Sequence, residues 1–445
     1  MRPYNSQPIP NEQSAIARGA AVCGPGGRRR WGQRAISLDE IFRVAEANSA
    51  RLRTSLASER EADMAVDEAR MARLPDIDAS LSVSFLGDGL TTARDLTDLH
   101  RAPIPHFGQG LGVKVTQPLY TGGAIANSIR LAELKSSAAR LATDLQRDNL
   151  RMRLTGLYLD IYKCANLRAV VDSNRQAALR VLAEMQARYE QGTALHNDIT
   201  RYELLVSDLD LELTRIGNTI SILNTDLVTL SGLPAGTVVI PDSSLLRQAM
   251  PSPGANRWQQ EAATESPRLK LASSGVEISR RAEDLVRAGR LPKVGLQAGW
   301  TMDGPILTEV PPINRNLSYW YVGVGVSYNV SSLFKSDKSL ARSRAATALA
   351  QTELEDARQG VAMAVNDAYV RWQETHIELA TRQKGVELAR SNYDIVSTRY
   401  AAGMALITDL LDAANSRLDA EQQLVNARIN IIYNYYRLLF TVGKI

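Results

Sequence analysis

Four short stretches of the chain alternate apolar and polar residues with a period of two, and they lie at about 76–86, 110–118, 293–302 and 319–330. In the first stretch the apolar positions are Ile77, Ala79, Leu81, Val83 and Phe85, and the polar positions are Asp76, Asp78, Ser80, Ser82 and Ser84. The other three stretches set mostly valine, leucine or aromatic residues against small or polar ones. This alternation predicts four strands, each with one apolar face and one small or polar face.

The length and composition of these strands favour a membrane barrel. Each is close to the roughly 9–11 residues that a tilted strand needs to cross a bilayer, and aromatic residues such as Phe107, Trp300, Tyr319 and Trp320 lie near strand ends. A half-buried antiparallel sheet in a soluble domain would show the same alternation. Four strands cannot close a barrel, because known closures begin at about eight strands. We therefore expect a homotrimer, whose roughly twelve strands would surround an open lumen and contact outer-membrane lipid.

The segments between the strands have the periodicity of long helices. No proline interrupts the chain between Pro118 and Gly192, and roughly 70 helical residues at about 1.5 Å each would form a rod near 100 Å long. Apolar residues recur there at three-, four- and seven-residue steps, and near the C-terminus Leu411, Leu418, Val425, Ile432 and Leu439 are each seven apart. This spacing predicts coiled-coil packing. A plain coiled-coil scaffold would explain these helices but leave the strands unexplained.

Glycine and proline mark the junctions between these elements. Gly192 and Gly403 follow long apolar patterns, where a left-handed residue ends a helix, so each predicts a helical hairpin turn. Pro75 and Pro292 directly precede predicted strands. Each predicts the end of the incoming helix, because the residue before a proline is driven out of the helical conformation. Pro118, followed by two glycines, marks the predicted return from strand to helix.

The order of elements occurs twice along the chain. The segment 188–198 recurs as 399–409, and the sequence Arg-Leu-Pro before the first strand recurs at 290–292. We predict a first repeat at 35–232, an equatorial connector at 233–265 and a second repeat at 266–445. Residues 1–34 lack the apolar core of a secretory signal and are expected to be a disordered or spurious leader.

Composition removes several classes of function. The chain has 445 residues, of which 44% are hydrophobic and 22% charged, and it contains no apolar run long enough for a membrane-spanning helix. Six of its 52 basic residues and one of its 48 acidic residues lie in 1–34, so the remainder has 46 basic and 47 acidic residues and no electrostatic basis for binding nucleic acid. Two cysteines cannot form a disulfide framework.

The sequence also lacks the residue patterns of an enzyme. Its four histidines have no metal-ligand spacing with cysteines or paired carboxylates, and no glycine-rich loop could hold a phosphate group. We therefore expect no catalytic residues, no metal and no cofactor. Any energy for transport would have to come from a partner protein.

Taken together, the motifs resemble those of the TolC family of outer-membrane efflux proteins. The match rests on Arg-Leu-Pro before the first strand, Gln-Pro-Leu-Tyr-Thr-Gly-Gly at 117–123 after the second, and Tyr189, Gly192 and Asp198 at the first hairpin. The resemblance implies a mixed α and β fold in which a trimer forms a twelve-stranded outer-membrane barrel and a long periplasmic α-helical tunnel. It also implies an exit duct for drug efflux or type I secretion, docked to a periplasmic adaptor (membrane fusion) protein and an inner-membrane transporter.

The same resemblance suggests the residues of a periplasmic gate. Asp409 and Asp412 match positions whose carboxylates ring the closed tip, although an aspartate in the first turn of a helix is also an ordinary cap. Asp198 and Tyr400 match positions that tether neighbouring helices. The basic partner expected at position 405 is Ala405 here, so the way the tip is latched stays open.

Two other classes of protein stay open at this point. A non-channel coiled-coil scaffold of the cell envelope would be a rod that needs no detergent, and an enzyme would need a nucleophile, a base and a pocket together. The cargo and the class of pump are not specified by the sequence, because a passive duct takes its specificity from its partners.

Overall fold

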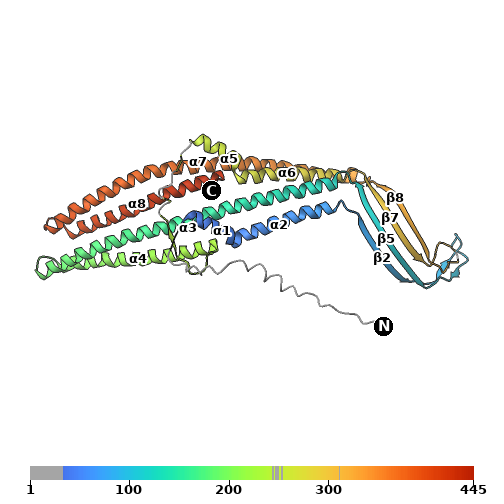
Figure 1. Ribbon diagram of the computed structural model, residues 1–445, viewed down its shortest axis with the longest axis horizontal. Coiled ribbons are helices and arrows are strands. Elements are labelled where there is room, and N and C mark those ends of the chain that lie inside the picture. The colour runs from blue at the N-terminus through green and yellow to red at the C-terminus, as the bar shows by residue number, and fades with distance from the viewer. Residues whose placement is uncertain (1–33, 243–244, 246–249, 252–253, 310) are drawn as a thin grey trace, which may run out of the picture.

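The protein is a long rod of helices that carries a four-stranded sheet at one end (Figure 1). The computed structural model describes residues 34–242, 245, 250–251, 254–309 and 311–445. Residues 1–33, nearly all of the predicted leader at 1–34, lie outside the described residues, and so do parts of the predicted connector. None of the described helices is both long enough and apolar enough to cross a bilayer.

The elements follow one another in an order that occurs twice. The helices are α1 (Leu38–Asn48), α2 (Ala50–Met71), α3 (Ala124–Glu190), α4 (His196–Ser231), α5 (Ala255–Glu265), α6 (Pro267–Ala288), α7 (Ser332–Ala401) and α8 (Ile407–Val442). The strands are β1 (Arg34–Ile36), β2 (Asp76–Phe85), β3 (Gly89–Thr91), β4 (His100–Ala102), β5 (Phe107–Tyr120), β6 (Val239–Pro241), β7 (Lys293–Gly304) and β8 (Leu317–Ser327). The series α2, β2, β5, α3, α4 is matched by α6, β7, β8, α7, α8.

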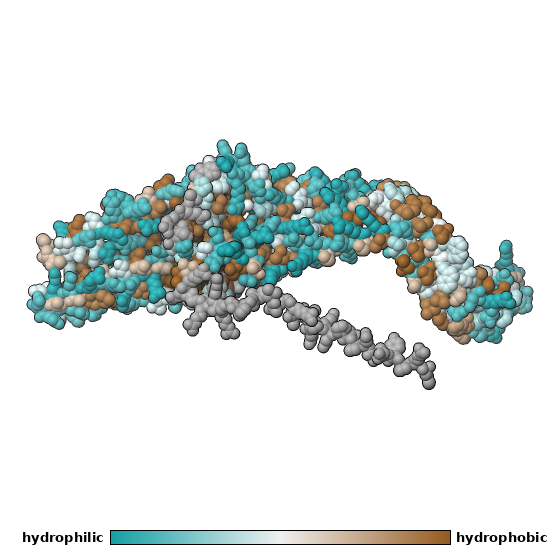
Figure 2. Space-filling view, viewed as in Figure 1, coloured by the Kyte–Doolittle hydropathy of each residue, from teal (hydrophilic) through white to brown (hydrophobic). Residues whose placement is uncertain are grey.

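The large sheet has the order β2-β5-β7-β8, and every neighbouring pair is antiparallel. Its register carries the apolar alternation from strand to strand, because Ile77 pairs with Val115, Val115 with Ala298, and Ala298 with Val322. Most apolar side chains of β2 and β8 are exposed in the single chain, whereas Val115 and Ala298 of the central strands are half-buried. Figure 2 shows hydrophobic residues gathered over the sheet and hydrophilic ones over the loops beyond it.

Most strand boundaries differ from the predicted ones by one to three residues, and two of these differences have a clear structural origin. β5 continues two residues past Pro118 to Tyr120, and its register with β7 shifts between these residues, so the proline lies within the strand at an irregularity. β8 ends at Ser327 rather than at 330. The reason is a turn in which the carbonyl of Asn329 accepts a hydrogen bond from the N–H of Ser332, which starts α7.

The long helices have the seven-residue spacing of a coiled coil. α3 has 67 residues and α7 has 70. Buried positions of α3 recur at every seventh residue: Ile129, Ser136, Thr143, Leu150, Leu157, Cys164, Val171, Ala178 and Met185. The half of α3 near the sheet therefore buries hydroxyl groups in its seam, whereas Leu134, Ala138 and Leu141, part of the predicted apolar stripe, are only half-buried.

The middle of the rod is thickened by α1, α5 and the parallel pair β1–β6 (Figure 1). Tyr158 of α3 is buried there, and its hydroxyl donates to the carbonyl of Ile36 (2.8 Å) and accepts from the N–H of Asp242 (2.6 Å). On the other side of the rod, Trp258 of α5 packs into a core with Trp372 of α7. The short elements thus pack against both long helices in the middle of the rod.

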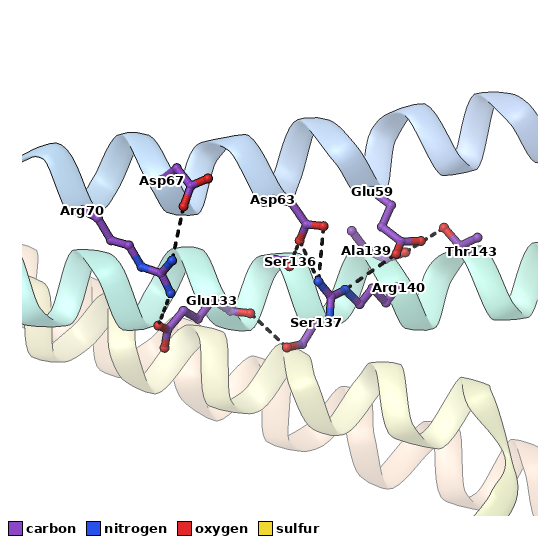
Figure 3. Close-up of polar contacts among 10 residues, drawn as sticks. All are labelled: Glu59, Asp63, Asp67, Arg70, Glu133, Ser136, Ser137, Ala139, Arg140 and Thr143. Carbon is purple, nitrogen blue, oxygen red and sulfur yellow. Dashed lines mark hydrogen bonds and ion pairs between the residues drawn. The ribbon is translucent and has the colours of Figure 1, made fainter. Parts of the chain in front are cut away.

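The hydroxyl groups of the α3 seam bind polar groups of α2 (Figure 3). Asp63 accepts hydrogen bonds from the Ser136 hydroxyl and from the Arg140 guanidinium, the latter at 3.0 and 3.2 Å. Thr143 donates to the backbone carbonyl of Ser55 at 3.3 Å. The Ser136 bond, followed by Arg140, lowers the pKa of the Asp63 carboxyl.

This lowered pKa predicts an acid-sensitive contact between α2 and α3. The folded pKa of Asp63 lies below its ordinary value of 3.8, so its contribution to stability is complete above that pH and is lost as the pH falls through the folded pKa. We expect Asp63→Asn to lower the urea unfolding midpoint at pH 7, and we expect its difference from the wild type to shrink as the pH falls below 3.8 through the folded pKa. The matched control is Glu68→Gln, an exposed acid on the same helix. Equal midpoints for wild type and Asp63→Asn at pH 7 would contradict this prediction.

Candidate functional site at the helical tip

Two helical hairpins, α3–α4 and α7–α8, end together at the end of the rod far from the sheet (Figure 1). Gly192 and Gly403 lie in the two turns with φ of +75° and +74°, a conformation that costs residues with a Cβ atom. Each turn is closed by paired backbone hydrogen bonds. The N–H groups of Thr193 and Met404 donate to the carbonyls of Arg188 and Arg399, at 2.9 and 2.8 Å.

The predicted gate aspartates lie in the first two turns of α8. One carboxylate oxygen of Asp409 accepts a hydrogen bond from the N–H of Leu406 (3.0 Å), so Asp409 acts as a helix cap. Asp412 lies three residues further along, which places it on the same side of the helix. Both aspartates are exposed in the single chain, so their carboxylates are accessible to solvent or to another copy.

Asp198 and Tyr400 meet across the two hairpins. Asp198 lies in the first turn of α4 and Tyr400 in the last turn of α7, close enough for the carboxylate to act on the phenol. Burial, followed by the negative charge of Asp198, raises the pKa of the Tyr400 hydroxyl, and the positive charge of Arg188 opposes this shift. The phenol therefore stays protonated near neutral pH.

Arg188 is the basic residue that the sequence analysis missed at the tip. It lines a small hollow of about 30 Å³ between the hairpins together with Tyr400 and Leu410. Its position in the last turn of α3, next to Tyr189 of the hairpin motif, was the available signal. Among the ion pairs of the described residues, none joins Asp198 to Arg201 or Arg399. Position 405 is a half-buried alanine.

Apolar packing holds the four tip helices in place. A core that runs through the two hairpins includes Val171, Met185, Ile199, Leu410 and Ala413, and α3 packs directly against α8. The carboxylates of α8 are thus carried by a rigid surface.

The prolines predicted at helix–strand transitions lie at the other end of the rod. Pro75 is the residue before β2, and Pro292 is the residue before β7. The return from β5 to α3 is made by Gly122 and Gly123, whose φ angles are +65° and +84°. A Cβ atom on Gly122 would lie 2.7 Å from the carbonyl oxygen of Ala288. Tight helix–sheet packing therefore requires glycine there.

This architecture defines a class of protein. A sheet with an exposed apolar face, joined to a long helical rod whose tip carries exposed aspartates, is typical of an outer-membrane channel subunit. The model of the family described as outer membrane efflux protein matches residues 42–216 and 258–444. The chain belongs to this family.

Curated relatives match almost the whole chain at low identity. The outer membrane protein TolC of Vibrio cholerae is 22% identical over 416 residues, which cover 92% of this chain and 91% of that protein. The outer membrane efflux protein BepC of Brucella suis is 21% identical, covering 93% of this chain and 87% of BepC. The pyoverdine export outer membrane protein OpmQ of Pseudomonas aeruginosa is 23% identical, covering 92% and 87%. These relatives are outer membrane proteins of efflux and export, not enzymes.

Solved structures show the same fold. CusC, a protein that forms a transmembrane channel, aligns with a TM-score of 0.78 at 14% identity and covers 99% of both chains. The outer membrane protein VceC of Vibrio cholerae aligns with a TM-score of 0.76 at 15% identity, covering 91% of this chain and 96% of VceC. The mostly helical fold with a smaller sheet therefore confirms the predicted resemblance.

The turn geometry predicts opposite effects for two glycine substitutions. We expect Gly403→Ala to destabilise the α7–α8 turn by about 1–2 kcal/mol, because alanine resists a left-handed φ, and to speed amide exchange at residues 399–410 by roughly five- to thirtyfold. Gly403→Asn should cost less, since asparagine tolerates this conformation. In Gly360→Ala, a control within α7 that has open space around its Cβ, amide exchange around residue 360 should slow instead. Wild-type exchange in Gly403→Ala would count against this prediction.

Proposed function

We propose that three copies of this chain form a passive exit duct across the outer membrane and the periplasm. The observation that carries the proposal is the pair of open sheet edges. Among the described residues, β2 pairs only with β5 and β8 only with β7, so each edge strand leaves a row of backbone groups unpaired. Pairing β8 of one copy with β2 of the next continues the antiparallel order, and three copies give about twelve strands, enough to close a barrel.

The two faces of the sheet fit opposite sides of such a barrel. The apolar face would meet lipid hydrocarbon, and exposed Trp320 and Phe107 would lie near the ends of the apolar band. The other face is built largely from serine and glycine, because Ser80, Ser82 and Ser84 pair with Gly112, Gly110 and Gly108. A Cβ atom on any of these glycines would lie within 3.0 Å of the paired serine hydroxyl. This face would line a polar, water-filled lumen.

The exposed aspartates of the tip support a gate at the periplasmic end. Three copies of Asp409 and Asp412 would bring six carboxylates around one axis. Such a ring attracts cations. Asp198 and Tyr400 would tether the two hairpins of each chain beneath this ring.

The family supports a role within a larger machine. We propose that the tip docks to a periplasmic adaptor protein and that an inner-membrane transporter supplies the energy for efflux or type I secretion. The names of the relatives cover different cargo: OpmQ exports pyoverdine, and the alkaline protease secretion protein AprF of Pseudomonas aeruginosa is 26% identical over 191 residues, 42% of this chain. The alternative function is a non-channel scaffold of the cell envelope, which the same helices would also form.

Ion selectivity in a planar lipid bilayer tests the duct and its gate together. Detergent-purified wild type should give trimer-dependent, cation-selective currents, and Asp409→Asn/Asp412→Asn should shift the reversal potential in a salt gradient toward zero, because the ring loses its charge. Asp419→Asn, an exposed acid further along α8, should keep the wild-type reversal potential. An unchanged potential in the double variant would remove the gate, and a protein that stays soluble and never conducts would favour the scaffold.

A further inference from the structure

A polar cluster joins the two hairpins at a level above the tip. Arg417 of α8 lies eight residues beyond Asp409, or about 12 Å along the helix. Its guanidinium donates two hydrogen bonds to the side-chain oxygen of Asn174 on α3, at 2.7 and 3.1 Å. The same guanidinium lies over the ring of Tyr393 on α7, 3.8 Å from the ring centroid. One side chain thus contacts the first and the second hairpin at once.

The fourth helix enters the cluster through a tyrosine. Tyr202 of α4 lies in the same core as Tyr393 of α7, and both line one small hollow with Asn174 and Arg417. We call Asn174, Tyr202, Tyr393 and Arg417 the Arg417 cluster. Every helix of the two hairpins contributes one member, and the hydrogen bonds from Arg417 to Asn174 tie α8 to α3.

Three members of the cluster are buried, and Arg417 is half-buried. Tyr202, Asn174 and Tyr393 are 1%, 7% and 8% exposed, and they lie in the apolar core of the hairpins. The side-chain nitrogen of Asn174 donates to Glu421 (2.9 Å), and Glu421 also accepts from Arg390 at 2.7 Å. Glu421 is thus tied to both Arg390 and Asn174, and the guanidinium of Arg417 is held by the Asn174 oxygen and the Tyr393 ring.

This arrangement is unlike the rest of the seam. Asn174 lies between Val171 and Ala178 in a stretch where the buried positions of α3 are otherwise apolar. Removing one member of a buried polar group leaves the others unpaired and costs more than truncating an exposed pair. Such a cluster therefore stabilises the packing of the hairpins when all its members are present, and losing one member weakens the contacts of the others. At the tip itself, Ala405 provides no basic side chain that could join the hairpins.

We propose that the Arg417 cluster is a second latch, in series with the Asp198–Tyr400 contact, that holds the two hairpins of each chain together while the duct is closed. This inference rests on the proposed channel function. Arg417 acts as a positioning residue: it touches no cargo and sets the position of α8, which carries Asp409 and Asp412.

Tip-to-tip distances test the latch directly. Spin labels would be attached at Thr193→Cys and Met404→Cys, two exposed turn positions, in full-length chain with Cys23→Ser and Cys164→Ala, and diluted with unlabelled chain. Double electron–electron resonance should show a longer and broader distance distribution in Arg417→Gln than in the parent. Arg417→Lys should restore it only in part, because lysine keeps the charge but loses the planar fork. Arg428→Gln, an exposed arginine on the same helix, is the matched control and should leave the distribution unchanged.

Conductance provides the second readout. If the latch closes the duct, Arg417→Gln should raise the ratio of open to closed states by roughly five- to thirtyfold over wild type and over Arg428→Gln. Tyr202→Phe removes only a hydroxyl, is expected to fold, and should change both readouts in the same direction by less. Parental distances in both Arg417→Gln and Tyr202→Phe would overturn the latch, whatever the currents. A wild type that carries no current would overturn the channel, while the distances would still decide whether the cluster tethers the hairpins.

Discussion

The unpaired backbone at the two edges of the sheet constrains the rest of the molecule. In hydrocarbon, an N–H or carbonyl group without a partner costs several kcal/mol, so a sheet that exposes an apolar face cannot also leave its edges open. The order β2-β5-β7-β8 puts one strand of each repeat at an edge. In the proposed channel, closure would therefore need other copies of the chain, and a closed ring of sheets would also arrange the helical rods around one axis.

The contacts between the long helices change in chemical character along the rod. Near the sheet, the seam between α2 and α3 is held by Ser136, which binds Asp63 (Figure 3), and by Thr143, which binds the backbone of Ser55. The second repeat shows the same chemistry, since buried Glu283 of α6 accepts from Thr347 of α7 at 3.4 Å. Towards the tip the seam is apolar apart from the Arg417 cluster. Polar seams fix the register of paired helices, because a shift by one turn would leave buried groups unpaired.

The sequence predicted the elements well and the contacts between repeats poorly. Alternation located the centres of all four strands, because the period of two is a local property of the chain. It could not locate the end of β5, where an irregularity places Pro118 within the strand, or the end of β8, which depends on the Asn329 turn. The parallel pair β1–β6 joins residues about 200 positions apart and has no local signal.

The candidate site shows the same difference between features with a local sequence signal and contacts between distant segments. Gly192, Gly403 and the aspartates of α8 were found because they belong to motifs, whereas Arg188 was missed because it adjoins its motif. The Arg417 cluster could not be predicted, since Asn174 and Arg417 are 243 residues apart and each fits an ordinary helix. Buried polar residues inside an apolar repeat were the only available trace, and the repeat alone does not tell which partner they meet.

The pairing of serine with glycine across β2 and β5 has a consequence for evolution. A Cβ atom added to any of these glycines would lie within 3.0 Å of the paired serine hydroxyl, so that hydroxyl would have to turn away. A substitution that enlarges one of these glycines therefore moves a side chain on the neighbouring strand before it offers a new contact at this face. If this face lines the proposed duct, changes of glycine and serine are coupled across β2 and β5. The exposed loops have no such coupling and can vary one residue at a time.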